Sequence, residues 1–316
     1  MKVNDLIFKE LLRRGYSLDG NTRVWNIADS KLWYLEEEQA KGYLKIEDSK
    51  SYKKGIAGKE IALLEKHMPA IAKKILHGSA VNIVDIGCGD GRKAVIPIQT
   101  LSEKTKVRYC PVDISSYMVT EAIKNIRKLE TGEVVEFKWN ISDFENLENI
   151  SSLLRDGEFR QNFLLFLGGT ATNFELHEVI HEVAEAVDSD IDYLLLGVGL
   201  QTGGDSVKKD TKTLSDKPLD NFLGLVLKQI GIERDDVEFG TRFKHGRIEW
   251  YYTIQQDKKI VLNNRSVTFY KGDQILVGHS YRYTREQFDE ALKIYFSEVE
   301  FFVNEDGSRA LVLCKK

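Results

Sequence analysis

A short apolar run that ends in a glycine-rich loop constrains the fold of this 316-residue chain more than any other feature. Residues 81–86 are apolar apart from Asn82 and Asp85, and glycines follow at alternate positions, Gly87, Gly89 and Gly91. A strand that breaks into such a loop and then a helix presents backbone N–H groups to a ligand. The G-x-G-x-G spacing differs from the G-x-G-x-x-G pattern of dinucleotide sites, and the preceding acid suits a ligand with an ammonium group. A tight turn without any ligand is the alternative interpretation.

Apolar runs recur along the middle of the chain at the spacing of alternating strands and helices. The predicted strands are 81–86, 107–112, 134–139, 163–167 and 193–198, with helices predicted at 92–101 and 116–129. Their nearly continuous Val, Ile and Leu content predicts a parallel sheet that is buried on both faces. Two short runs, 299–303 and 310–313, flank an Asn/Asp/Gly-rich turn and predict a terminal antiparallel hairpin.

The segments 1–77 and 203–283 do not follow this alternation. Residues 1–77 are predicted to be a mostly helical cap, with clustered aromatic residues between positions 25 and 52. Residues 203–283 combine one predicted helix with several β-rich runs, which indicates an inserted antiparallel sheet. We therefore expect an α/β domain of 78–202 and 284–316, and a second α+β lobe from the other two segments that shapes a substrate site.

Composition and charge argue against several functional classes. The chain is 42% hydrophobic and 30% charged with a formal net charge of −4, and it has no basic patch, so nucleic acid is not an expected partner. Its three cysteines, Cys88, Cys110 and Cys314, show no metal-ligand spacing and fit a reducing compartment. No run is typical of a signal peptide or a membrane span, so we expect a cytoplasmic protein. Because the cysteines lack metal-ligand spacing, we expect no metal. Nothing in the sequence indicates an oligomeric state.

Polar residues follow the predicted strands at the edge where ligands bind in open parallel sheets. Asp113 suits ribose hydroxyls, or caps the next helix. Asp143 and Phe144 suit the amino group and ring of adenine. Gly168 allows a ligand to approach the backbone. Asn173 offers a donor and an acceptor to an amino-acid group, or caps a helix at 175–187.

The motifs at 87–93, 111–115, 142–144, 166–174 and 194–197 together resemble the histidine-specific, S-adenosylmethionine (SAM)-dependent methyltransferase family. That family includes the enzyme that trimethylates the histidine amino group in ergothioneine biosynthesis. The resemblance implies SAM as cofactor and a Rossmann-like, seven-stranded class I methyltransferase sheet with a terminal hairpin. The residues expected to bind SAM are Asp85, Gly87, Gly89, Gly91, Lys93, Asp113, Asp143, Phe144 and Gly168.

The same resemblance implies substrate contacts, and here the chain departs from the family. Asn173, Tyr52 and Tyr283 are expected to position the acceptor, with Ser280 as a further contact. An aspartate usual in the family is replaced by Gly199, and a family tyrosine is absent from the stretch at 214–216.

The residues thought to hold the imidazole differ as well. The glutamate that grips it in the ergothioneine enzyme corresponds to Gly278, while the serine remains as Ser280. A neutral imidazole loses a strong acceptor there. We therefore expect N-methylation of another amino acid or of an amino-acid-derived small molecule. A non-catalytic SAM or S-adenosylhomocysteine (SAH) binding protein, acting as a sensor or an enzyme partner, and a SAM-dependent aminobutyl transferase are the alternatives, since the fold does not decide which bond breaks.

Overall fold

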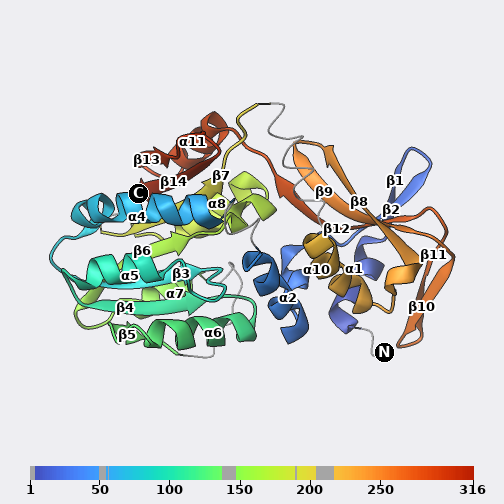
Figure 1. The fold of residues 1–316 in the computed structure, drawn as a ribbon, viewed down its shortest axis with the longest axis horizontal. Coiled ribbons are helices and arrows are strands. Elements are labelled where there is room, and N and C mark those ends of the chain that lie inside the picture. Colours follow the sequence, from blue (N-terminus) through green and yellow to red (C-terminus); the bar gives the residue numbers. More distant parts are fainter. Residues whose placement is uncertain (1–3, 50–54, 56, 137–146, 189–190, 204–216) are drawn as a thin grey trace. The chain divides into compact units, whose positions relative to one another are not determined.

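The computed structural model describes the chain except for residues 1–3, 50–54, 56, 137–146, 189–190 and 204–216. It divides into two compact units (Figure 1): unit 1 is Met1–Ile46 with Gly203–Arg282, and unit 2 is Glu47–Thr202 with Tyr283–Lys316. The first division therefore falls near residue 46 and not near the expected residue 77. The reason is helix α4 (Gly58–Ile75), which packs against α5 (Val95–Ser102) and the last strand of unit 2.

A seven-stranded sheet with the order β13-β14-β7-β6-β3-β4-β5 forms the centre of unit 2. The five strands from β7 to β5 are parallel, whereas β14 runs antiparallel to both β7 and β13. This order confirms the predicted Rossmann-like sheet and its terminal hairpin. The strands are β3 (Ala80–Ile86), β4 (Val107–Val112), β5 (Glu133–Val134), β6 (Phe159–Phe166), β7 (Tyr193–Gly199), β13 (Glu298–Val303) and β14 (Arg309–Lys315). The third predicted strand, 134–139, is described only as far as residue 136, and β5 ends at Val134.

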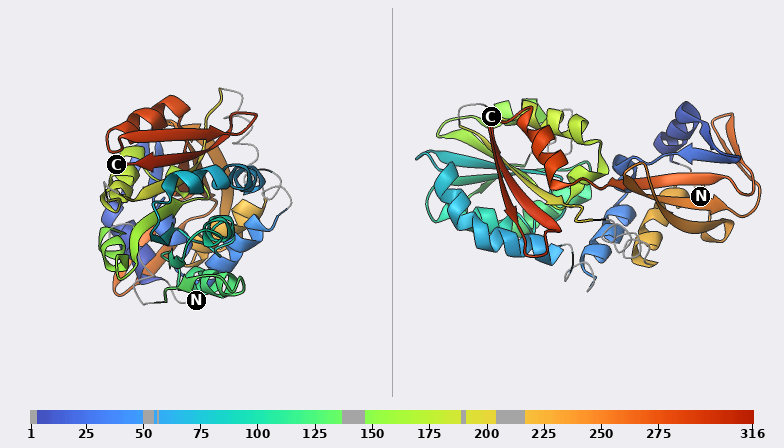
Figure 2. Two further views of the ribbon diagram at one scale, coloured as in Figure 1. Left: turned by 90° about the vertical axis from the view of Figure 1, so that its left-hand side faces the viewer. Right: turned by 90° about the horizontal axis from the view of Figure 1, so that it is seen from above.

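Helices cover both faces of this sheet, as the right-hand view in Figure 2 shows. Alternate strand residues enter two different hydrophobic clusters because successive side chains of a strand point to opposite faces. Ile83 packs on the side of α4, α5 and α6 (Ser116–Arg127), and Val84 on the opposite side. The helices of that opposite side are α7 (Leu147–Leu154), α8 (Leu176–Glu185) and α11 (Arg285–Lys293). Burial on both faces explains the continuous apolar runs of the sequence.

Unit 1 contains a five-stranded sheet with the order β1-β2-β12-β9-β8 and a separate β10–β11 hairpin. The prediction that residues 1–77 are mostly helical is wrong at β1 and β2, because β2 pairs in parallel with β12, with Trp25 opposite Ile275. Strand β8 was also not predicted. The strands are β1 (Tyr16–Asp19), β2 (Thr22–Asn26), β8 (Val237–Lys244), β9 (Arg247–Ile254), β10 (Lys258–Leu262), β11 (Arg265–Phe269) and β12 (Gln274–Tyr281).

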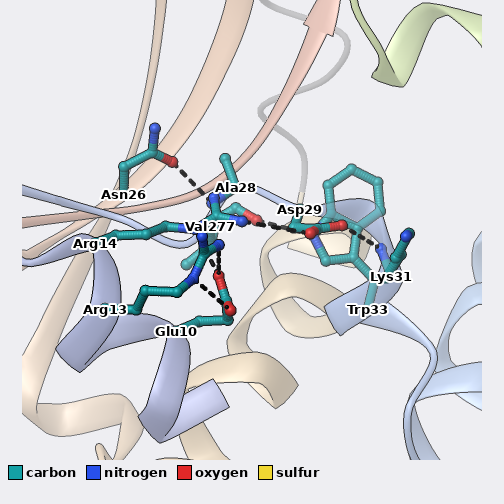
Figure 3. A network of polar contacts seen from close by, with 9 residues as sticks. All are labelled: Glu10, Arg13, Arg14, Asn26, Ala28, Asp29, Lys31, Trp33 and Val277. Atoms are coloured by element: carbon teal, nitrogen blue, oxygen red, sulfur yellow. Dashed lines mark hydrogen bonds and ion pairs between the residues drawn. The ribbon is translucent and has the colours of Figure 1, made fainter. Parts of the chain in front are cut away.

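Helices α1 (Asp5–Arg14), α2 (Glu37–Glu47) and α10 (Lys217–Lys228) complete unit 1 together with the short helices η1 (Ser30–Trp33) and η6 (Arg234–Asp236). The apolar faces of α1 and α10 share one hydrophobic cluster with the sheet. Polar contacts fix the connection from β2 into η1 (Figure 3): the Asn26 side chain accepts the Ala28 N–H, and the Asp29 side chain accepts the Lys31 N–H.

Trp33 fills the space beside a glycine of β12. Its indole Nε1 donates a hydrogen bond of 2.8 Å to the Val277 carbonyl oxygen (Figure 3). A Cβ atom built on Gly278 would lie 2.5 Å from Trp33 Cζ2 and 3.0 Å from Trp250 Cε3. Both tryptophans are buried. The position that the resemblance assigns to an imidazole-binding glutamate is therefore closed to any side chain by two indole rings.

We expect Gly278→Ala to destabilise the protein by about 1–3 kcal/mol, because the added methyl group overpacks the tryptophan pair. Gly224→Ala is the matched control in the same unit. It lies within α10, and its Cβ would meet only the Tyr252 hydroxyl at 3.4 Å, so alanine should be neutral or stabilising there. Chemical denaturation of both variants measures the difference, and equal free energies of unfolding would contradict the packing argument.

Candidate active site

The loop after β3 is shaped by its three glycines. Gly87, Gly89 and Gly91 have φ angles of 63°, 53° and 77°, in the left-handed region that glycine adopts without strain. A Cβ on Gly91 would lie 3.2 Å from the backbone of Ala122, so this glycine allows α6 to approach the loop. A Cβ on Gly89 would meet no atom of the described residues within 4 Å. The Gly89 backbone therefore lies beside open space, where a ligand can reach it.

Asp85, near the end of β3, is more deeply buried than its position before a ligand loop suggested. It is only 4% exposed, and the Tyr109 hydroxyl donates a hydrogen bond of 2.7 Å to its Oδ2. Burial raises the pKa of Asp85 to about 7, while the Tyr109 hydrogen bond and the charge of Lys93 act in the opposite direction. The carboxyl group therefore changes its protonation state near neutral pH, and a cationic ligand group beside it would favour the ionised form.

Asp113, directly after β4, is tied to the glycine loop. Its Oδ2 accepts the Gly89 N–H at 3.1 Å, and its Oδ1 accepts the Ser115 N–H at 2.9 Å. The cap of α6 is Ser115, whose hydroxyl accepts the Met118 N–H, so the helix-cap alternative does not apply to Asp113. A carboxylate has about four acceptor positions, which leaves Asp113 able to accept further hydrogen bonds. Burial raises the pKa of Asp113 to about 6, although the backbone N–H bonds lower it.

Three charged side chains lie at the ends of β6 and β7, and all are close to glycines. Lys93 Nζ would be 2.8 Å from a Cβ on Gly168, whose φ is 85°. The Gly168 N–H donates to Glu60 Oε1 at 2.7 Å, and that oxygen would be only 2.3 Å from a Cβ on Gly197.

Glu60 is 1% exposed and was not among the predicted site residues. The signal that could have found it is an acid on the apolar face of α4, four residues before the fully buried Leu64. The third charged side chain, that of Arg309, lies near Gly169 and Gly199.

Asn173 ends the short helix η5 (Thr170–Asn173), which follows β6. A Cβ on Gly87 would lie 3.6 Å from Thr170 Oγ1, so this short helix packs against the glycine loop. The cap of α8 is Glu175, which accepts the N–H groups of the first turn, so Asn173 is not the cap. Among the described residues no hydrogen-bond partner is found for the partly buried Asn173 side chain. Its amide is therefore available to a ligand.

Tyr283 and Ser280 are placed differently from Asn173. The Tyr283 hydroxyl oxygen accepts the Leu176 N–H at 3.1 Å, and the ring packs edge-on against Phe288, so Tyr283 supports the start of α8. Ser280 belongs to unit 1, where its hydroxyl accepts a hydrogen bond of 2.7 Å from Arg282 Nη1. Tyr52, Asp143 and Phe144 lie outside the described residues.

The candidate site therefore consists of the predicted residues that the structure describes at the carboxyl ends of β3, β4 and β6. Within the described parts of the chain, no group of three or more His, Cys, Asp or Glu side chains is arranged to hold a metal ion. Over the same residues, no helix has both the length and the apolar character needed to cross a membrane.

We expect Tyr109→Phe to destabilise the protein by about 1–3 kcal/mol above pH 7, where Asp85 is ionised and loses its hydroxyl donor. Because burial raises the pKa of Asp85, the folded state favours the protonated carboxyl. The stabilisation that this protonation gives the folded protein is lost as the pH rises through about 7. Without the Tyr109 hydroxyl the pKa of Asp85 rises further. At low pH, where the carboxyl is protonated, the substitution therefore lowers the free energy of unfolding by less. Urea denaturation at about pH 5.5 and 8.5 measures the difference. In an Asp85→Asn background the pH dependence of the Tyr109→Phe effect should vanish, and its persistence would contradict this assignment.

Comparison with known proteins identifies the family of this chain. The family model for histidine-specific, SAM-dependent methyltransferases matches residues 43–316. No curated protein sequence matches significantly. Similar solved structures include a candidate methyltransferase from Thermobifida fusca, with 12% identity over 89% of each chain and a TM-score of 0.48. DesVI of Streptomyces venezuelae has 10% identity over 90% of this chain and 99% of its own, with a TM-score of 0.38.

The sugar N-methyltransferase KedS8 from a Streptoalloteichus species has 12% identity over 82% of this chain and 89% of its own, with a TM-score of 0.39. The family match, by contrast, covers most of the chain, from the middle of α2 to the last residue. This chain therefore belongs to the histidine-specific, SAM-dependent methyltransferase family, and it is a SAM-dependent methyltransferase.

Proposed function

We propose that this methyltransferase N-methylates the amine of an amino acid, or of a small molecule derived from one, other than free histidine. The observation that carries the proposal is Asn173, which ends the short helix η5 that packs against the glycine loop through Thr170, and whose amide has no hydrogen-bond partner among the described residues. An amide can accept an N–H of an acceptor amine and donate to a carboxylate of the same molecule.

The residues of unit 2 fit the cofactor of the family. Asp113 has acceptor positions left for two ribose hydroxyls, and the open space at Gly89 admits the ligand to the backbone. Asp85 suits an ammonium group because a cation beside it favours its ionised form. We propose the same role in SAM binding for Gly87, Gly91, Lys93 and Gly168, and, from the sequence, for Asp143 and Phe144. When bound, SAM supplies a methyl group on a sulfonium centre.

Methyl transfer from a sulfonium requires an amine lone pair in line with the bond that breaks. Alignment and close approach contribute more to such a reaction than a strong acid or base. Asn173 would orient the amine, and Tyr283 would fix the start of α8 that follows Asn173. Tyr52 and Ser280 are proposed as further contacts from the sequence alone.

Gly278 is the argument against free histidine. The glutamate that the resemblance associates with imidazole binding is missing, and two buried tryptophans occupy the space that its side chain would need. An acceptor without an imidazole fits the chain better.

We expect Asn173→Ala to lower kcat/KM for the amine acceptor about 10- to 100-fold, which corresponds to one charge-assisted hydrogen bond of roughly 1.5–3 kcal/mol. The Kd for SAM should stay unchanged. His177→Ala, an exposed position on the adjoining helix α8, serves as the matched control. The assay uses methyl-labelled SAM with a panel of amino acids and the corresponding acids that lack the amine. Product masses identify the transferred group, and SAM binding without transfer to any amine would contradict the proposal.

We expect Asp113→Asn to weaken SAM binding about tenfold or more, because an amide keeps only one acceptor oxygen. In the unchanged protein the affinity should fall as the pH drops below about 6, where Asp113 becomes protonated. Titration calorimetry with SAH over a pH series measures both effects. Glu133→Gln on β5, an exposed carboxylate, is the control. The same pH dependence in Asp113→Asn would assign it to another group.

A further inference from the structure

Arg309 occupies the end of the sheet next to the proposed acceptor position. It is the first residue of β14 and pairs with Gly199, the last residue of β7. Its Cζ and Nη2 would be 3.8 Å from a Cβ on Gly199, and its Nη1 would be 3.4 Å from a Cβ on Gly169. The guanidinium therefore lies beside the ends of both β6 and β7. Gly199 is also the position at which the sequence comparison leads one to expect an aspartate.

The nearest carboxylate does not satisfy this guanidinium. Arg309 Nη1 is 3.7 Å from Glu60 Oε2, beyond hydrogen-bond distance, and the other Glu60 oxygen already accepts the Gly168 N–H. Both Nη1 of Arg309 and Oε2 of Glu60 are buried without a hydrogen-bond partner among the described residues. Glu60 is 1% exposed, whereas the Arg309 side chain keeps 12% exposure. Glu60 thus positions the arginine electrostatically and leaves its donors available.

Arg309 and Asn173 flank the same short turn. Gly169 is the N-cap of η5 and Asn173 is its last residue, so the two groups stand at opposite ends of η5. At a rise of roughly 2 Å per residue, that turn spans about 8 Å. An acceptor whose amine lies at Asn173 can therefore reach Arg309 with a second group several bonds away. Lys93 is the other cation near the end of β6: its Nζ lies 3.7 Å from Glu47 Oε1 and would be 2.8 Å from a Cβ on Gly168.

We propose that Arg309 is a specificity-determining residue that binds an anionic group of the methyl acceptor, a carboxylate or a phosphate, with Glu60 as its positioning residue. The planar guanidinium presents five N–H donors in a fork that matches such anions. The preferred acceptor is then an amine that carries an additional negative charge, as in an acidic or phosphorylated amino acid. This inference rests on the proposed function, since it names the substrate class of the same site.

The test compares acceptors that differ only in this charge. Glutamate against glutamine probes a carboxylate, and phosphoserine against serine probes a phosphate. We expect the unchanged protein to prefer the anionic member of at least one pair about 10- to 100-fold in kcat/KM. Arg309→Gln should reduce that preference to about twofold or less. Equal rates for both members of each pair, or an unchanged preference in Arg309→Gln, would overturn the inference.

A second variant neutralises the positive charge of Arg309 without removing the arginine. Gly199→Asp introduces a carboxylate beside Nη2, at a position where a Cβ meets only ordinary contacts of 3.8 Å and where φ is not positive. The new carboxylate should pair with Arg309 and abolish the anion preference as well. Lys59→Gln removes a cation on α4 that pairs with Asp306, and this control should keep the preference.

Binding to the SAH-loaded protein separates this inference from the proposed function. Calorimetry should detect glutamate or phosphoserine with the unchanged protein and lose the signal in Arg309→Gln. If these anions bind through Arg309 but the protein methylates none of the amines, the anion site is supported and the proposed function is contradicted. Failure of both anionic amines to bind the SAH-loaded protein would overturn the anion site itself.

Discussion

The candidate site depends on the absence of side chains at three glycines near the ends of β6 and β7. Lys93 lies over Gly168, Glu60 over Gly197, and Arg309 over Gly199. Each of these glycines leaves a volume that a charged side chain from another element enters, so helix α4, the glycine loop and the final strand meet at one edge of the sheet. Charges brought together in this way are partly shielded from water, which strengthens their interactions. The polar character of the site is therefore a result of backbone geometry as much as of the acidic and basic residues themselves.

Helix capping divides the polar residues near this edge into two groups. Ser115 and Glu175 cap α6 and α8, and in doing so they satisfy the backbone donors that Asp113 and Asn173 would otherwise bind. Asp113 is held by two backbone N–H groups, one of them from the glycine loop. Asn173 remains without a partner among the described residues. Whether a candidate residue can bind a ligand thus depends on whether neighbouring side chains already satisfy the local backbone donors. The residue type alone does not show this.

Much of unit 2 could be predicted because buried parallel strands leave a clear pattern of continuous apolar residues, and the positions of β3, β4, β6 and β7 along the chain follow from it. The seven-stranded architecture was implied by the family resemblance. Candidate site residues could be proposed from the sequence where they follow a predicted strand, as Asp113 does directly after β4 and Asn173 does after the turn that follows β6. Glu60 was missed because it comes from a helix that precedes the glycine loop, and its contact with Gly168 is a tertiary one. Strands β1 and β2 were missed because their pairing depends on β12, at the other end of the chain. The contact of the Tyr283 hydroxyl with the Leu176 N–H of α8 is a tertiary one that the sequence pattern does not reveal, and an acceptor contact of Tyr283 stays a prediction.

The pairing of β2 with β12 has a consequence for biosynthesis. Val24 lies opposite Gln274 in a parallel register, so the sheet of unit 1 cannot form until nearly the whole chain has left the ribosome. Contacts between such distant segments slow folding, because a long loop must close before they form. Meanwhile the apolar faces of α1 and β2, including Ile7, Phe8 and Trp25, have no partner sheet to cover them. The apolar faces of α1 and β2 therefore stay exposed until β12 is available, and exposed apolar surface of this kind favours aggregation during folding.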